Sequence, residues 1–115
     1  MVKGRCMAKA DKARTEFMVF YKAYHTACLN RDAAFLKSIL PAGVPDDEFA
    51  FVLEMSQASA QAIETAGITP RIELAGDRCN VIYEGDLGDD MTELNLDFYL
   101  GPDGRWLKYD PGAEG

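Results

Sequence analysis

Residues 92–100 read Thr-Glu-Leu-Asn-Leu-Asp-Phe-Tyr-Leu, and from Glu93 onward polar and apolar side chains alternate. Successive side chains of a strand point to opposite faces of its sheet, so this period of two predicts a strand with one buried and one exposed face. The predicted buried face carries Leu94, Leu96, Phe98 and Leu100. The predicted exposed face carries Glu93, Asn95, Asp97 and Tyr99.

The sequence around this strand predicts three more strands. Stretches of similar alternation lie at 69–75 and 79–85, and a shorter one follows at 105–109. Two four-residue segments with hairpin-turn composition, Ala75-Gly76-Asp77-Arg78 and Gly101-Pro102-Asp103-Gly104, separate neighbouring strands. Short turns of this kind join adjacent antiparallel strands, so we expect a four-stranded antiparallel meander.

Before residue 68 the apolar period is helical. One stripe spaced for a helix face consists of Phe17, Phe20, Tyr21, Tyr24 and Cys28. Asp32 is a suitable N-cap for a second helix, whose inward residues would be Phe35, Leu36, Ile39 and Leu40. A third helix is expected to begin at the acidic residues 46–48 and to bury Phe49, Val52, Leu53, Ser56, Ala60 and Ile63. Gly67 would end it with a left-handed cap.

This order of elements predicts an α+β domain, with N-terminal helices packed on a curved four-stranded antiparallel sheet. A chain of 115 residues is long enough for one ordinary core and too short for two. We expect a basic N-terminal arm or helix start at 1–13, one domain at 14–110 and a flexible tail at 111–115.

Charge is distributed unevenly along the chain. The net charge is −7, yet the first forty residues contain eight Lys and Arg against three Asp and Glu. The remaining residues contain four basic and sixteen acidic side chains, and such a surface repels phosphate, so we expect no nucleic-acid partner. The basic arm could touch an anionic surface, but a solvated helix start is the simpler interpretation. No apolar run approaches the length of a membrane span, so no membrane partner is expected.

The three cysteines, Cys6, Cys28 and Cys79, form no C-x-x-C motif. An odd number without that spacing argues against a disulfide framework and against a zinc site. Reduced thiols predict a cytoplasmic location. Cys28 and Cys79 lie among apolar residues and are expected in the core. We expect no cofactor and no metal.

Two stretches resemble a known superfamily. Residues 17–24, followed by Asn30-Arg31-Asp32 and an apolar helix, resemble the opening of the nuclear transport factor 2-like (cystatin-like) α+β cone. Residues 97–109, with a glycine turn before Trp106, resemble its closing hairpin. The resemblance covers most of residues 14–110 and concerns architecture. The superfamily includes isomerases, dehydratases, ligand carriers and dimerisation modules, so the fold alone does not assign a function.

The resemblance implies one candidate chemistry. In enzymes with this cone a strand carboxylate often acts as a base and a helix tyrosine donates to an oxyanion, roles that Asp97 and either Tyr21 or Tyr24 could take. Asp97 also fits the alternation of any solvent-facing acid on a half-buried strand. His25 is the single histidine; it could act as a base or simply bond on the surface, and it cannot form a multi-histidine metal site.

Two further features have a plain and a functional interpretation. The acidic loop 85–90 could hold calcium, but its spacing is not that of an EF-hand, so an exposed turn is favoured. The chain also has more tyrosines than a core of this size needs, because each buried hydroxyl requires a partner. That surplus predicts a ligand pocket or an interface, with ligand-binding residues Phe20, Tyr21, Tyr24, Tyr83, Tyr99 and Trp106.

The sequence therefore leaves three hypotheses. The first is a non-catalytic cone that forms a homodimer through its sheet and binds a small apolar ligand. The second is a small isomerase- or dehydratase-like enzyme with Asp97 as base and Tyr24 or His25 as helper. The third is a regulatory module whose acidic face binds a partner. An enzyme requires Asp97 in a cavity, a ligand binder requires an apolar pocket, and an interaction module requires an exposed apolar patch.

Overall fold

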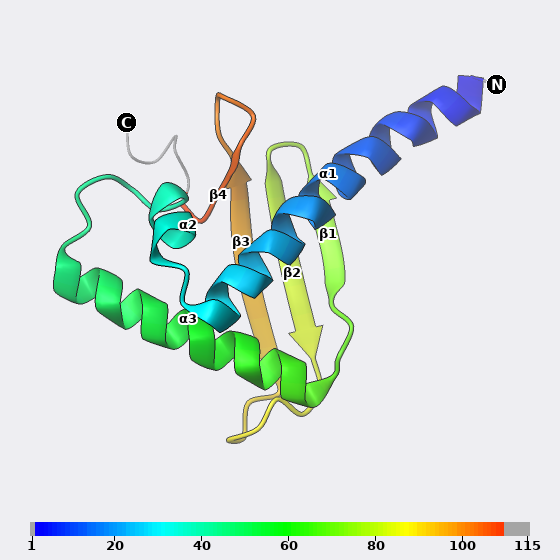
Figure 1. Ribbon diagram of the computed structural model, residues 1–115. Helices are drawn as coiled ribbons and strands as arrows, with labels where there is room; N and C mark the ends of the chain where they lie inside the picture. The colour runs from blue at the N-terminus through cyan, green and yellow to red at the C-terminus, as the bar shows by residue number, and fades with distance from the viewer. Residues whose placement is uncertain (1, 110–115) are drawn as a thin grey trace.

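The computed structural model describes the backbone of residues 2–109 and the side chains of residues 12–109. Its first element is the long helix α1, Val2–Asn30. The N-terminal turns of α1 extend beyond the edge of the sheet (Figure 1). The expected basic arm is thus the start of this helix. Lys3, Arg5 and Lys9 lie where only the backbone is described, and the expected tail 111–115 lies outside the described residues.

The ends of the helices follow the predicted capping chemistry. α1 ends where Arg31 adopts a left-handed backbone conformation, with φ of 52°. The Asp32 carboxylate then accepts the Phe35 backbone N–H at 3.1 Å and caps α2, Ala33–Ser38. α3, Asp46–Ala66, begins with three acidic residues and ends at Gly67, whose φ of 65° and N–H bond to the Ile63 carbonyl complete a left-handed cap.

Four antiparallel strands follow in the order in which they occur along the chain. They are β1 Arg71–Ala75, β2 Arg78–Glu84, β3 Glu93–Leu100 and β4 Trp106–Leu107. The first hairpin pairs Ala75 with Arg78, and Gly76 takes the positive φ of 62° that this tight turn requires. β1 starts two residues later than expected, directly after Pro70, which has no N–H to donate. β4 is shorter than the expected 105–109.

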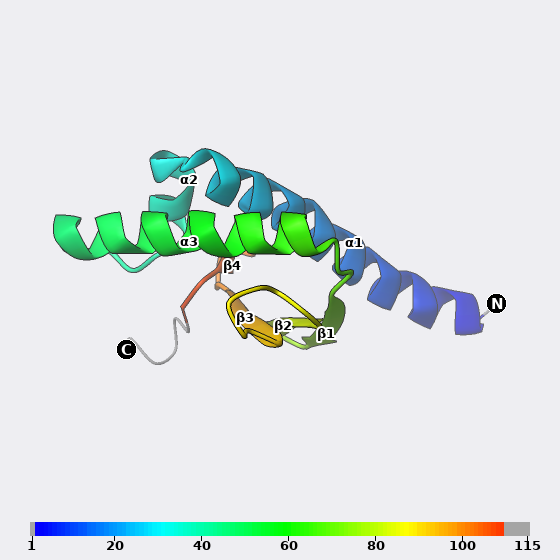
Figure 2. The same ribbon diagram turned by 90° about the horizontal axis from the view of Figure 1, so that it is seen from below.

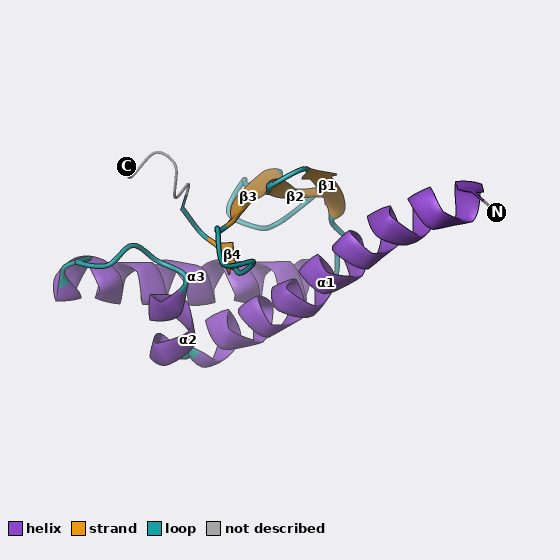
Figure 3. Cartoon of the chain, turned by 90° about the horizontal axis from the view of Figure 1, so that it is seen from above, coloured by secondary structure: helices purple, strands orange, loops and turns teal. Residues whose placement is uncertain are grey.

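The helices form one layer and the strands a second layer on one side of it (Figures 2 and 3). The helices therefore pack on one face of an antiparallel sheet, which confirms the predicted α+β class. The predicted alternation in β3 is also confirmed, because Phe98 is fully buried whereas Glu93, Asn95 and Asp97 are exposed. Whether the sheet closes into a cone stays a prediction.

The core lies between the two layers and is rich in aromatic rings. Phe17 has no exposed surface, and its ring lies 5.5 Å from that of Phe98 and 5.0 Å from that of Trp106. Cys28 and Cys79 are free thiols, each 2% exposed, as expected for small core residues. Burial raises the pKa of both thiols.

Candidate functional site

An open apolar groove of about 610 Å³ lies where the middle of α1 passes over the sheet. Its walls come from α1, from α2 and its C-cap, and from both short hairpin ends of the sheet. The lining residues are Ala13, Glu16, Val19, Phe20, Phe35, Ser38, Ile39, Leu74, Gly76, Leu100, Gly104, Arg105 and Trp106. A space of this size is typical of sites for small organic molecules.

Aromatic side chains on the two helices form one wall. Phe20 and Phe35 stack with ring centroids 6.2 Å apart and an interplanar angle of 26°, and both rings are half-buried. Val19 lies beside them and exposes 67% of its surface, more than any other large apolar side chain described. Its exposed surface is apolar area that a molecule bound in the groove would cover.

The opposite wall comes from the ends of the strands. Leu74 and Leu100 lie on the helix-facing side of β1 and β3, each beside a glycine turn. Trp106 of β4 is 8% exposed, and its ring packs edge-on against Phe17 beneath the groove. The helices cover the middle of the sheet, while these apolar strand ends remain partly open.

Two charged residues line the groove, Glu16 and Arg105. Arg105 is held in its turn by Asp103, whose carboxylate accepts the Arg105 backbone N–H at 3.1 Å and the side-chain Nε–H at 2.9 Å. These bonds hold the pKa of Asp103 below its usual range. The Glu16 carboxylate has no hydrogen-bond or ion-pair partner among residues 12–109, the part of the chain with described side chains. The groove thus combines an apolar body with two charges of opposite sign.

Three of the predicted ligand-binding tyrosines pack into the core. The Tyr21 and Tyr83 hydroxyls are hydrogen-bonded at 2.6 Å, and Tyr24 interacts with Cys28 and Ser56. Burial is the main cause that raises the pKa of Tyr21, and the bond to Tyr83 adds to it. The space beside Tyr21 and Tyr24 is only about 10 Å³, which is no larger than one water. These three tyrosines therefore lie in a filled core, where the hydroxyls of Tyr21 and Tyr83 partner each other.

Of the six predicted ligand-binding residues, Phe20 and Trp106 line the groove. Tyr99 lies on the other face of the sheet, where the Arg78 guanidinium sits 5.1 Å from its ring centroid and donates to its hydroxyl at 3.3 Å. The surplus of tyrosines therefore divides between the core and the outer face of the sheet.

The predicted catalytic residues do not come together. Asp97 is exposed on the outer face of the sheet, where its carboxylate accepts a hydrogen bond from Asn80 across the strand pair. Tyr24 is buried on the opposite face. His25 Nε2 lies 2.7 Å from Glu64 Oε1 and so links α1 to α3. An acid on the solvent side and a donor on the core side cannot act on one substrate.

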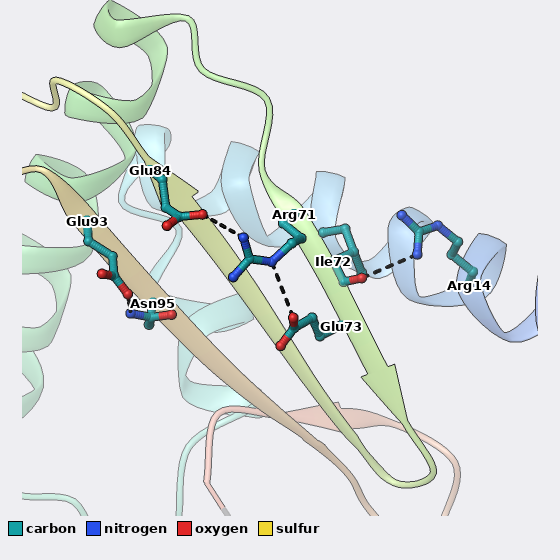
Figure 4. A network of polar contacts seen from close by, with 7 residues as sticks. All are labelled: Arg14, Arg71, Ile72, Glu73, Glu84, Glu93 and Asn95. Carbon is teal, nitrogen blue, oxygen red and sulfur yellow. Dashed lines mark hydrogen bonds and ion pairs between the residues drawn. The ribbon is translucent and has the colours of Figure 1, made fainter.

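The outer face of the sheet is polar (Figure 4). Arg71 bonds to Glu84 at 2.6 Å and to Glu73 at 3.2 Å, and the Glu84 carboxylate is the main cause that raises the pKa of Arg71. Asn95 donates to Glu93 at 2.7 Å on the same face. An apolar patch for dimerisation through the sheet is not present among these described residues.

The acidic loop 85–90, between β2 and β3, is an exposed turn held by hydrogen bonds within the loop. Its only buried side chain is Leu87, and its backbone bonds internally, with Gly85 donating to Thr92 and Leu87 to Met91. The Asp86 carboxylate accepts the Gly88 N–H at 3.0 Å. Within the part of the chain whose side chains are described, no three His, Cys, Asp or Glu residues are grouped to hold a metal ion.

Comparisons with protein-family models, with curated proteins and with solved structures find no match for this chain. Its similarity to the nuclear transport factor 2-like superfamily therefore stays a prediction from residues 17–36 and 97–109. Among the described residues, no helix is both long and apolar enough to cross a membrane.

Sequence reasoning missed most of the groove. Val19, Leu74 and Arg105 were not predicted as site residues, although Val19 and Leu74 each had a weak signal. Val19 is an apolar residue outside the buried stripe of its helix, and Leu74 ends an apolar strand face directly before a glycine turn. Such apolar positions at the edge of a core are where an incompletely covered surface is expected.

Proposed function

We propose that this protein is a non-catalytic domain that binds a small, mainly apolar molecule in the groove between α1, α2 and the ends of the sheet. The observation that carries this proposal is the groove itself, which has about 610 Å³ of space and a predominantly apolar lining. Only Glu16 and Arg105 are charged among its lining residues. A site of this composition gains affinity from burial of apolar surface and orientation from few polar contacts.

The chemistry of the walls specifies the ligand further. The stacked Phe20 and Phe35 rings and the Trp106 indole favour a flat or cyclic apolar body. Arg105, fixed by Asp103, is placed to meet a polar or anionic group at one end of that body. A carrier or sensor of an amphiphilic small molecule fits these features better than an enzyme, because Asp97 lies on the other face of the sheet.

The experiment is a fluorescence titration with the neutral apolar dye phenylnaphthylamine. We expect Val19→Trp to lower the affinity at least about tenfold, since the larger side chain occupies the groove. The matched control is Phe51→Trp, because Phe51 is an equally exposed apolar residue of α3, at 61%, and does not line the groove.

The two variants separate specific from nonspecific binding. Dye binding that Val19→Trp weakens and Phe51→Trp leaves within about twofold supports the groove. Dye binding that Val19→Trp leaves unchanged, or no dye binding at all, contradicts the proposal. Circular dichroism of both variants verifies that each is folded.

A further inference from the structure

α3 has a second apolar stripe on the side that faces away from the core. Phe51, Met55, Ala58 and Ala62 follow the spacing i, i+4, i+7, i+11, so they lie in one line along the helix. Phe51 is 61% exposed and Met55 49%, and Ala58 is also exposed. The buried residues Phe49, Ala60 and Ile63 occupy the opposite side. α3 therefore has one apolar face that packs on the core and a second apolar stripe that is turned to solvent.

We propose that this stripe is a self-association surface, on which α3 of a second copy of the chain packs in antiparallel orientation. This surface lies outside the proposed ligand groove and does not depend on it. Two features of the stripe, its gradient of side-chain size and its neighbouring charges, favour a second copy as the occupant.

The first feature is the distribution of large and small side chains. The two large residues lie toward the N-terminal end of the stripe and the two alanines toward its C-terminal end. In an antiparallel pair centred between Met55 and Ala58, Phe51 faces the partner's Ala62 and Met55 faces the partner's Ala58. Large side chains then fill the space left by small ones, and the alanines let the helices approach closely. A two-fold pair of this kind is self-complementary and closed.

The second feature is charge. Four acidic residues, Asp46, Asp47, Glu48 and Glu54, lie in the N-terminal half of α3, and α3 contains no Lys or Arg. A parallel pair would place these acids side by side, which is unfavourable. The antiparallel pair instead places Glu48 near the partner's Thr65 and Glu54 near the partner's Ser59. The distribution of charge and the distribution of side-chain size therefore both favour the antiparallel orientation of the two α3 helices.

The size of the stripe sets the expected strength. Stable protein interfaces bury roughly 800 Å² on each partner, which two exposed side chains and two alanines do not supply alone. We therefore expect an equilibrium between monomer and dimer that shifts with protein concentration.

The first experiment is sedimentation equilibrium of the full chain and of exposed-site variants. Phe51→Glu is expected to raise the dimer dissociation constant about a hundredfold. Both copies carry the substitution, so the interface loses two buried rings and gains two charges. Met55→Glu is expected to raise it at least about tenfold. Val19→Glu changes an equally exposed valine on α1 and is expected to leave it within about twofold.

The second experiment measures orientation. A spin label at Glu48→Cys, in a Cys6→Ser background, reports the distance between the two copies. In the antiparallel pair the labelled positions lie about 25 Å apart along the axis, at 1.5 Å per residue. A parallel pair would place them about 10 Å apart, the spacing of packed helices. A protein that remains monomeric at millimolar concentration, a dimer unaffected by Phe51→Glu, or the short distance would each overturn the proposal.

Discussion

The space between the helices and the sheet differs on the two sides of α1. On one side, which we call the filled half of that space, Phe17, Tyr21 and Tyr24 pack into the core, and the Tyr21 hydroxyl is hydrogen-bonded to that of Tyr83. On the other side, the open half, Glu16, Val19 and Phe20 line a groove of about 610 Å³. The difference indicates where function resides. The filled half holds buried tyrosines in a closed core, and the open half provides apolar walls with one charge of each sign.

The filled half is the source of stability, and Phe17 is the residue that tests this most strongly. Replacing Phe17 by Ala is expected to lower the free energy of unfolding by about 3–5 kcal/mol, because its buried ring packs against four aromatic neighbours. Val19→Ala, two residues away in the groove wall, is expected to change it by no more than about 0.5 kcal/mol. Urea denaturation measures both. Similar losses for the two variants would remove the contrast.

The hydroxyl pair of the filled half is tested by Tyr21→Phe and Tyr83→Phe. Each single change is expected to cost about 1–2 kcal/mol, because it leaves the other hydroxyl buried without its partner. The double variant should cost less than the sum of the two, since no orphaned hydroxyl remains. A double-mutant cycle in urea measures the difference. Strictly additive losses would show that the two hydroxyls do not depend on each other.

Alkaline pH should destabilise the filled half. Burial raises the pKa of Cys79 from 9.0 to about 11 and raises those of Tyr21 and Tyr24 above their ordinary 10.0. The unfolded state then releases protons that the folded state keeps, so stability is fully present below pH 9.0 and falls as pH rises above it.

Lys108 works in the opposite direction, because burial lowers its pKa from 10.5. The effect of this one lysine is opposite in sign to the effects of Cys79, Tyr21 and Tyr24, and these three groups together outweigh it. We therefore expect a net loss of stability at alkaline pH. Urea midpoints recorded from neutral pH to about pH 11 measure it, and Tyr21→Phe should reduce the slope. A stability that rises above pH 9.0 would contradict the burial of these groups.

The smallest expected effect concerns Asp97. Because Asp97 is exposed on the far side of the sheet, Asp97→Asn should change the free energy of unfolding by at most about 0.5 kcal/mol. Dye affinity in the groove should stay within about twofold. The same fluorescence and urea measurements decide this. A tenfold loss of dye affinity would restore Asp97 as part of a ligand site.

Local chemistry made most of the fold predictable. Asp32 as an N-cap, Gly67 as a left-handed helix end and the alternation in β3 each depend on neighbouring residues in the chain, and each is confirmed. Strand boundaries were less accurate, because Pro70 and the short β4 are governed by what pairs across the sheet.

The site was much less predictable, for a physical reason. A surplus of tyrosines could indicate a pocket or a core, and the choice depends on whether hydroxyls from α1 and β2 meet, as those of Tyr21 and Tyr83 do across 62 positions of sequence. The groove likewise combines residues from α1, α2 and two hairpins. The weak signal at Val19, an apolar residue outside the buried stripe of its helix, does not show which other elements would face it.

The most direct test of the central claim is methyl NMR of the full chain during titration with phenylnaphthylamine. The groove predicts that the methyl signals of Val19, Leu74 and Leu100 shift together and saturate at one dye molecule per chain, while Met55 on α3 stays unchanged. Shifts concentrated at Met55, or no saturable shift at Val19, Leu74 and Leu100, would contradict a ligand site in the open half of the molecule.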